Sequence, residues 1–179
     1  MEKSTFWTLI DSARDKSGGD PDEMAEILLK KLSGRSVEDI IAFDKYLDYY
    51  SRAAYDAKLF AAASVIDDLS DDDFDYFRFW LISRGEQAFL ECLKNPAALA
   101  EVAEPDEPVT AEEIGSVPSR AYERKTGKSD FASKFSPAPY PPMKNSSLVW
   151  RTSEGYADPA RLRELFPALW DRFRDDSDE

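Results

Sequence analysis

Residues 70–85, SDDDFDYFRFWLISRG, contain the start, the body and the end of one predicted helix. Ser70 is a favourable N-cap, and the three aspartates that follow it would lie against the positive end of the helix dipole. Phe77 and Leu81 have the spacing of one apolar helix face, and Gly85 is a typical C-terminal residue. The stretch therefore predicts a helix whose apolar face packs against a core.

Similar start signals recur along the chain and determine the predicted fold class. Some are a capping residue followed by proline, and others resemble capping boxes. No sustained apolar/polar alternation indicates strands. We predict an all-α fold, a single-domain multi-helix bundle over residues 1–174, with further helix starts at Ser4 or Thr5, Asp20, Ser36, Asn95, Thr110 and Asp158.

Residues 37–66 contain neither glycine nor proline. They predict either one long helix or two helices that meet near Ser51 and Arg52. Alanines recur in the second half of this stretch, so that a neighbouring helix could pack closely against it. We expect it to be the central element.

The region before the C-terminal helix differs in composition from the rest of the chain. Prolines and serines gather between Pro118 and Trp150, which predicts a long Pro/Ser-rich irregular segment. A loop of this length in a compact domain is functional or mobile. A last helix is expected over 158–173, followed by a frayed acidic tail at 175–179.

The charge of the chain restricts its partners. With 36 acidic and 23 basic residues among 179, the formal net charge is −13, and the excess of acids is concentrated in residues 1–107. Nucleic acid and anionic membrane surfaces would be repelled. A charged partner is therefore expected to be a basic protein.

Histidine is absent and Cys92 is the only cysteine. The commonest general base, the Ser-His and Cys-His pairs, thiolate zinc sites and internal disulfides are thereby excluded. We expect no cofactor and no metal, and a reducing, cytoplasmic environment. No stretch has the length and hydropathy of a membrane span, and the first ten residues do not resemble a signal peptide.

Carboxylates at Asp71, Asp73 and Asp75 have the alternation of a calcium loop. Counted from Asp71, however, Tyr76 and Ile82 occupy the positions that need glycine and glutamate. Capping of the helix explains these acids better. Carboxylate-pair catalysis stays formally open, but 36 acids make the presence of a pair uninformative.

Arginine beside aromatic side chains can bind a carboxylate or phosphate, and the predicted helix contains two such arginines. Each could instead form an exposed intramolecular ion pair or suit a helix end. Tryptophans more often belong to the core, and Cys92 in its apolar run predicts a buried thiol. The candidate binding residues are Asp72, Asp75, Tyr76, Arg78, Trp80, Arg84 and Trp150; no catalytic residue is predicted.

Three blocks of the sequence, residues 6–10, 72–85 and 158–170, resemble the bacterial family catalogued as domain of unknown function 4240. The resemblance implies a free-standing single-domain bacterial protein. It brings no reaction, cofactor or catalytic residue with it. The run Asp71 to Asp73 contains more acids than the family pattern leads us to expect.

Two classes of function follow from these observations, and a third stays open. The first is a non-enzymatic interaction protein, of the immunity or antitoxin type, that binds a basic partner. The alternative is a small-ligand-binding or regulatory domain with a pocket between the helical body and segment 118–150. The third is an enzyme of unknown reaction.

Overall fold

The computed structural model describes residues 1–105, 107–135, 137 and 139–174, so that the predicted tail at 175–179 lies outside the described residues. Over these residues the chain is all-α, with two isolated β-bridges and no strand. None of the helices found there is long and apolar enough to cross a membrane. The α-helices are α1 (Lys3–Ser17), α2 (Pro21–Ser33), α3 (Val37–Ala53), α4 (Ala57–Ile66), α5 (Asp71–Ser83), α6 (Glu86–Lys94), α7 (Leu99–Val102), α8 (Glu112–Thr126), α9 (Pro159–Leu165) and α10 (Pro167–Phe173); two 3-10 turns span Pro96–Ala98 and Phe131–Ser133.

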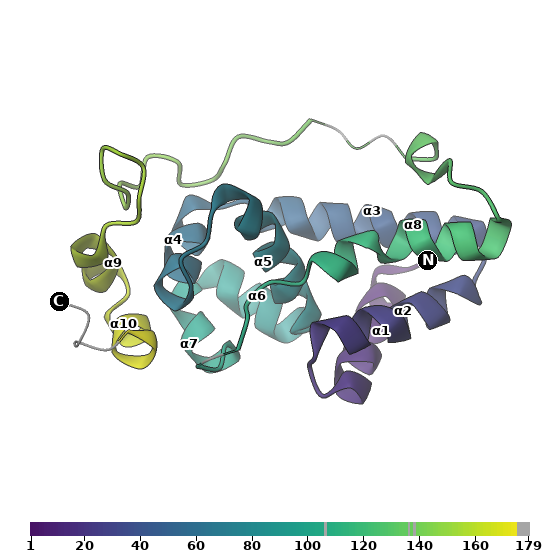
Figure 1. Cartoon of the computed structure of the whole chain (residues 1–179), viewed down its shortest axis with the longest axis horizontal. Coiled ribbons are helices and arrows are strands. Elements are labelled where there is room, and N and C mark those ends of the chain that lie inside the picture. Colours follow the sequence, from purple (N-terminus) through teal and green to yellow (C-terminus); the bar gives the residue numbers. More distant parts are fainter. Residues whose placement is uncertain (106, 136, 138, 175–179) are drawn as a thin grey trace.

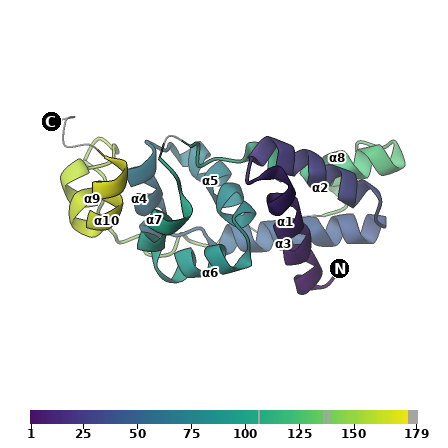
Figure 2. The ribbon, with the colours of Figure 1, turned by 90° about the horizontal axis from the view of Figure 1, so that it is seen from below.

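The helices form an elongated body (Figures 1 and 2). At one end α2 packs against α1 and α8, and α8 also contacts α3 and α5. Helices α4 to α7 occupy the middle, and α9 and α10 pack against α4 at the other end. The chain after α8 returns along the whole length of the body to reach α9 (Figure 1).

Most of the predicted helix starts are confirmed by hydrogen bonds. The side chains of Asp20, Ser36 and Asp158 each accept a bond from a backbone N–H three residues later. Ser70 and Asp73 form a reciprocal capping box at the start of α5. Three starts differ: Ser4 and Thr5 lie inside α1, Asn95 precedes a 3-10 turn and forms no side-chain cap bond, and Ala111 rather than Thr110 precedes α8.

The stretch 37–66 is two helices, as one of the two alternatives predicted. The break lies at residues 54–56, slightly later than expected. Asp56 is extended, and its carboxylate accepts bonds from the N–H groups of Lys58 and Leu59 at the start of α4. Nearly every side chain of α4 is buried, so that it is the central helix of the middle section.

Two sequence boundaries are corrected by the structure. Segment 118–150 was predicted to be irregular from Pro118, but α8 continues through Pro118 to Thr126. Pro118 lacks one backbone donor, and the burial of its ring with Val117 and Ala121 in a helix packed on α2 outweighs that loss. The predicted C-terminal helix is two helices, because Pro167 cannot donate a helical bond and disfavours helical geometry at Phe166.

Candidate functional site

The predicted site residues lie in separate places. Asp75 and Arg78 are one helical turn apart on α5, whereas Trp80 and Arg84 belong to another side of the same helix. Asp72 is exposed near the start of α5, and Tyr76 lies beside Glu112, whose negative charge raises the pKa of the phenol. Trp150 is buried against Phe60 and lines a different pocket from Trp80 and Arg84. The structure therefore does not assemble these residues into one site.

Arg78 is buried, with 1% of its side chain exposed. It pairs with Asp75, as predicted, but it also donates hydrogen bonds to the carbonyls of Ser51 (3.1 Å) and Phe74 (3.3 Å) and to the hydroxyl of Tyr140 (3.2 Å). The expectation of an exposed ion pair at Arg78 is therefore wrong. Arg78 connects α5 with α3 and with the chain after α8, and we withdraw it as a surface contact.

The described part of residues 127–150, which we call the strap, is attached to α3 mainly through Tyr140. The Tyr140 ring lies 4.3 Å from the guanidinium carbon of Arg52, and Arg52 donates to the carbonyl of Pro139 (2.9 Å). Further along, Lys144 forms a β-bridge with Asp56 at the α3–α4 break: its N–H donates to the carbonyl of Tyr55, and its carbonyl accepts from the N–H of Ala57. The strap is thus held over the helical body at more than one point.

A groove of about 330 Å³ lies beneath the strap, and we call it the strap groove. Its walls are α3 on one side, residues of α5 and α8 at the base, and the strap on the other side. A Cβ atom at Gly115 would lie 2.6 Å from the ring of Phe79, so that glycine allows α8 to approach α5 there. The lining residues are Asp44, Leu47, Asp48, Ser51, Phe79, Gly115, Phe131, Ala132, Phe135, Pro137 and Tyr140.

Asp44 distinguishes this groove from an ordinary apolar crevice. Its carboxylate is half-buried and has no hydrogen-bond or ion-pair partner among the residues that the structure describes. Burial raises the pKa of the Asp44 carboxyl to about 6, and the charge of Asp48 one turn away adds to the effect. Asp48 itself is paired with Arg52 (2.7 Å).

Asp44 is not among the candidate residues predicted from the sequence. The available signal was that Asp44 and Asp48 share a helix face with the apolar Leu47, but such carboxylates are frequent in a chain with 36 acids. Only the return of the strap encloses this face. The groove lies between the helical body and the irregular segment, where the alternative function placed a pocket.

The chemistry of the strap groove suits a cation that has an apolar stem. Aromatic and aliphatic walls would contact the stem, and the Asp44 carboxylate would accept hydrogen bonds from the charged group. A cation already lies near one aromatic ring of the strap, since Lys45 Nζ lies 5.8 Å from the ring centre of Phe135. Lysine and arginine side chains have the required form.

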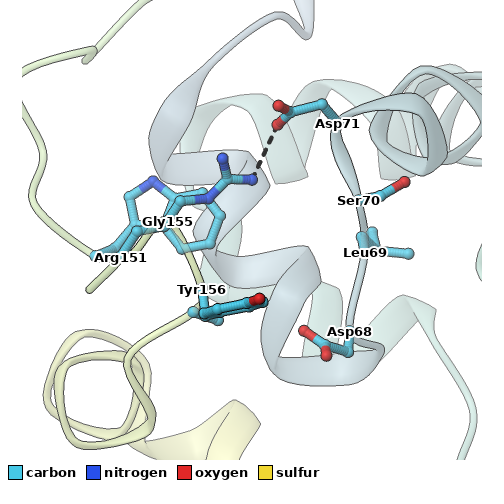
Figure 3. A pocket seen from close by; sticks show the side chains of 9 residues that line it. Asp68, Leu69, Ser70, Asp71, Arg151, Gly155 and Tyr156 are labelled. Carbon is cyan, nitrogen blue, oxygen red and sulfur yellow. Dashed lines mark hydrogen bonds and ion pairs between the residues drawn. The ribbon is translucent and has the colours of Figure 1, made fainter. Parts of the chain in front are cut away.

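A second pocket, of about 350 Å³, contains Trp150 and the acids before α5 (Figure 3). Arg151 lies over the rings of Phe60 and Trp150, 4.6 and 4.4 Å from their centres, and pairs with Asp71 (3.0 Å). Across the opening from Asp71 lies Tyr156, which is largely exposed (Figure 3). Its arginine is already paired, and the other charged group of its lining, Asp68, is exposed, so that this pocket offers no buried charge without a partner among the described residues.

The other candidate groups have structural roles. Asp73 bonds to Ser70, which lowers the pKa of the Asp73 carboxyl, and Asp71 is bound to Arg151. Within the described ranges, no group of three acidic or cysteine side chains could hold a metal ion. Cys92 is fully buried, and burial raises the pKa of its thiol to about 12, as expected of an inert thiol.

Comparison with known proteins identifies the family of this chain. Searches of the curated proteins and of the solved structures find no match to this chain. A family model described as "Protein of unknown function (DUF4240)" matches residues 1–124. The match ends within α8, so that the strap, α9 and α10 follow the matched region. The extent of the match shows that the chain belongs to the DUF4240 family.

Proposed function

We propose that the protein is a non-enzymatic interaction protein that binds a basic protein partner, in the manner of an immunity protein or antitoxin. The strap groove receives a lysine or arginine side chain of that partner, and binding takes place in the cytoplasm. The lone, buried Cys92 is consistent with such a reducing compartment.

The observation that carries the proposal is the carboxylate of Asp44 in the strap groove, which has no partner among the described residues. Burial of a charge without a partner costs free energy, and a bound ammonium or guanidinium group would recover much of that cost. The neighbouring Asp48 cannot neutralise Asp44, because Asp48 adds negative charge and is itself bound to Arg52. A cationic side chain is the complement that the groove lacks.

The charge of the whole chain supports the same partner. A net charge of −13 attracts a basic protein over a distance and accelerates its encounter with the groove. Salt screens such attraction, so that association should slow as ionic strength rises. The groove would then determine the orientation of the bound partner.

Capture from a lysate of the native host tests the proposal when three baits are compared. The baits are the natural chain, Asp44→Asn, and Glu123→Gln as a control that removes an equal charge from an exposed position on α8. We expect a basic protein that the natural chain and Glu123→Gln retain at low salt and that Asp44→Asn loses. Equal retention of every captured protein by Asp44→Asn and the natural chain would contradict the proposal.

The position of the strap groove favours one second candidate, a small-ligand-binding domain. A volume of about 330 Å³ lies within the range of small-molecule pockets. Titration of the purified protein with phenethylamine, a small amine with an aromatic ring, separates the two candidates. Saturable binding that Asp44→Asn abolishes, without capture of a basic protein, would favour the small ligand.

A further inference from the structure

A separate pocket of about 290 Å³ lies at the end of α5, on the side away from Asp75 and Arg78. It is bounded by the turn between α1 and α2, by the end of α5 and by the chain before α8. The lining residues are Gly18, Gly19, Asp20, Pro21, Trp80, Arg84, Glu107 and Pro108. Two of them, Trp80 and Arg84, are among the candidate binding residues predicted from the sequence.

Arg84 is held rigidly along one edge of its guanidinium group. Nη2 donates to the carbonyl of Gly19 (2.6 Å) and to the hydroxyl of Ser83 (2.9 Å), and Nε also donates to Ser83 (3.1 Å). The guanidinium carbon lies 5.2 Å from the ring centre of Trp80. Backbone, hydroxyl and aromatic contacts thus position the group before any ligand arrives.

The other edge of the guanidinium group is unsatisfied. Nη1 of Arg84 donates to no acceptor among the described residues, and no carboxylate there lies within ion-pair distance of Arg84. The ion pair considered for Arg84 from the sequence is therefore not formed within that part of the chain. Burial of the group lowers the pKa of Arg84, as expected of a partly desolvated cation without a close counter-ion.

Gly19 keeps this nitrogen accessible. A Cβ atom at residue 19 would lie 3.3 Å from Nη1 of Arg84, and the backbone of Gly19 has a φ of +94°, which side chains rarely adopt. A side chain at this position would crowd the nitrogen that has no acceptor. The turn between α1 and α2 therefore leaves space in front of the unsatisfied edge of Arg84.

The acids of the pocket determine which anion fits. A guanidinium edge binds carboxylate or phosphate oxygens. Glu107 is close enough that its charge acts on Arg84, and Asp20 lines the same space with one carboxylate oxygen bonded to the N–H of Glu23. Two negative charges beside the anion position disfavour a dianion such as phosphate. They favour a ligand that has a positive group next to its carboxylate.

We propose that this pocket binds a zwitterion of the size of an α-amino acid. Its carboxylate accepts hydrogen bonds from Nη1 of Arg84, and its ammonium group lies toward Glu107 and Asp20. The pocket volume, at the small end for ligand sites, agrees with a ligand of this size. The site is separate from the strap groove, so that either proposal can fail without the other.

Titrations of the full chain with L-alanine, sodium acetate, methylamine and inorganic phosphate test the proposal, with amide chemical shifts near Gly19 and Arg84 as the readout. We expect saturable shifts with L-alanine and affinity at least about tenfold weaker for each of the three single-charge or dianionic probes. Arg84→Gln should abolish the shifts. Arg124→Gln, which removes an exposed arginine from α8, should leave them unchanged.

Glu107→Gln provides a second test that does not depend on the bonds of Arg84. Glu107 is exposed, so that this variant should stay folded, bind L-alanine about tenfold more weakly and bind acetate more tightly. Absence of any shift with L-alanine, equal or tighter binding of phosphate, or binding that survives both Arg84→Gln and Glu107→Gln would overturn the proposal.

Discussion

At the scale of single residues, Asp44 links stability to pH. The pKa of its carboxyl is about 6 in the folded chain and close to 3.8 when the chain is unfolded, because burial favours the neutral form. Between about pH 4 and pH 6 the Asp44 carboxyl is therefore more protonated in the folded chain than in the unfolded chain. As the pH rises through this range the folded chain loses that proton, and the free energy of unfolding falls. We expect Asp44→Asn to raise the free energy of unfolding at pH 8 by about 1–3 kcal/mol. Urea unfolding from pH 4 to 8 measures this, and a Glu123→Gln control with the same gain would contradict it.

We expect the substitution Arg78→Ala to lower the free energy of unfolding strongly. Alanine would leave a cavity and would deprive Asp75, Tyr140 and the carbonyl of Ser51 of a donor. Removal of one partner from a buried charge network costs about 3–5 kcal/mol. Asp75→Asn should cost less than Arg78→Ala, because Asp75 is 58% exposed and the amide oxygen of asparagine can still accept a hydrogen bond from Arg78. Similar losses of unfolding free energy for Arg78→Ala and Asp75→Asn would show that Arg78 is not the centre of the network.

At the scale of elements, substitutions in α5 compare the contribution of a helix cap to stability with that of buried core side chains. Ser70→Ala removes the capping box and should lower the free energy of unfolding by about 1 kcal/mol. Phe77→Ala or Leu81→Ala should lower it by about 2–5 kcal/mol, since both side chains are fully buried. The three variants are compared by denaturant unfolding at pH 7. A loss at Ser70 as large as that at Leu81 would mean that the N-terminus of α5 has a further role.

At the scale of the whole molecule, the residues that follow the region matched by the family model complete the core. Trp150 packs 4.9 Å from Phe60, and Leu162, Phe166 and Leu169 are buried with it. Each such side chain contributes about 1.5–3 kcal/mol on burial. A chain that ends at Thr126 should therefore bind the dye ANS and unfold at a clearly lower urea concentration than the full chain. Cooperative unfolding of the shortened chain at the original midpoint would show that residues 1–126 fold independently.

Local signals in the sequence determined the helical class and most helix starts. A cap such as Ser70 or Asp158 is a hydrogen bond within three residues, so that its pattern is visible in the order of the residues. The pairing of Asp75 with Arg78 is similarly local, because the two residues are one turn apart on one helix. Local signals predicted the end of α8 too early, because the missing backbone donor of Pro118 is visible in the sequence. The packing of that helix on α2 is not.

Only the tertiary structure decided which charged groups are satisfied. Arg78 is buried because Tyr140, 62 residues later, closes over it, and Asp44 is enclosed by the same return of the strap. Gly19, which precedes Arg84 by 65 residues, leaves space at the guanidinium edge that has no acceptor among the described residues. Burial and hydrogen-bond satisfaction arise from groups that meet in space. For that reason the sequence could name the arginines of α5 as candidates, but not show which of them, or which acid on α3, has a charge without a partner among the described residues.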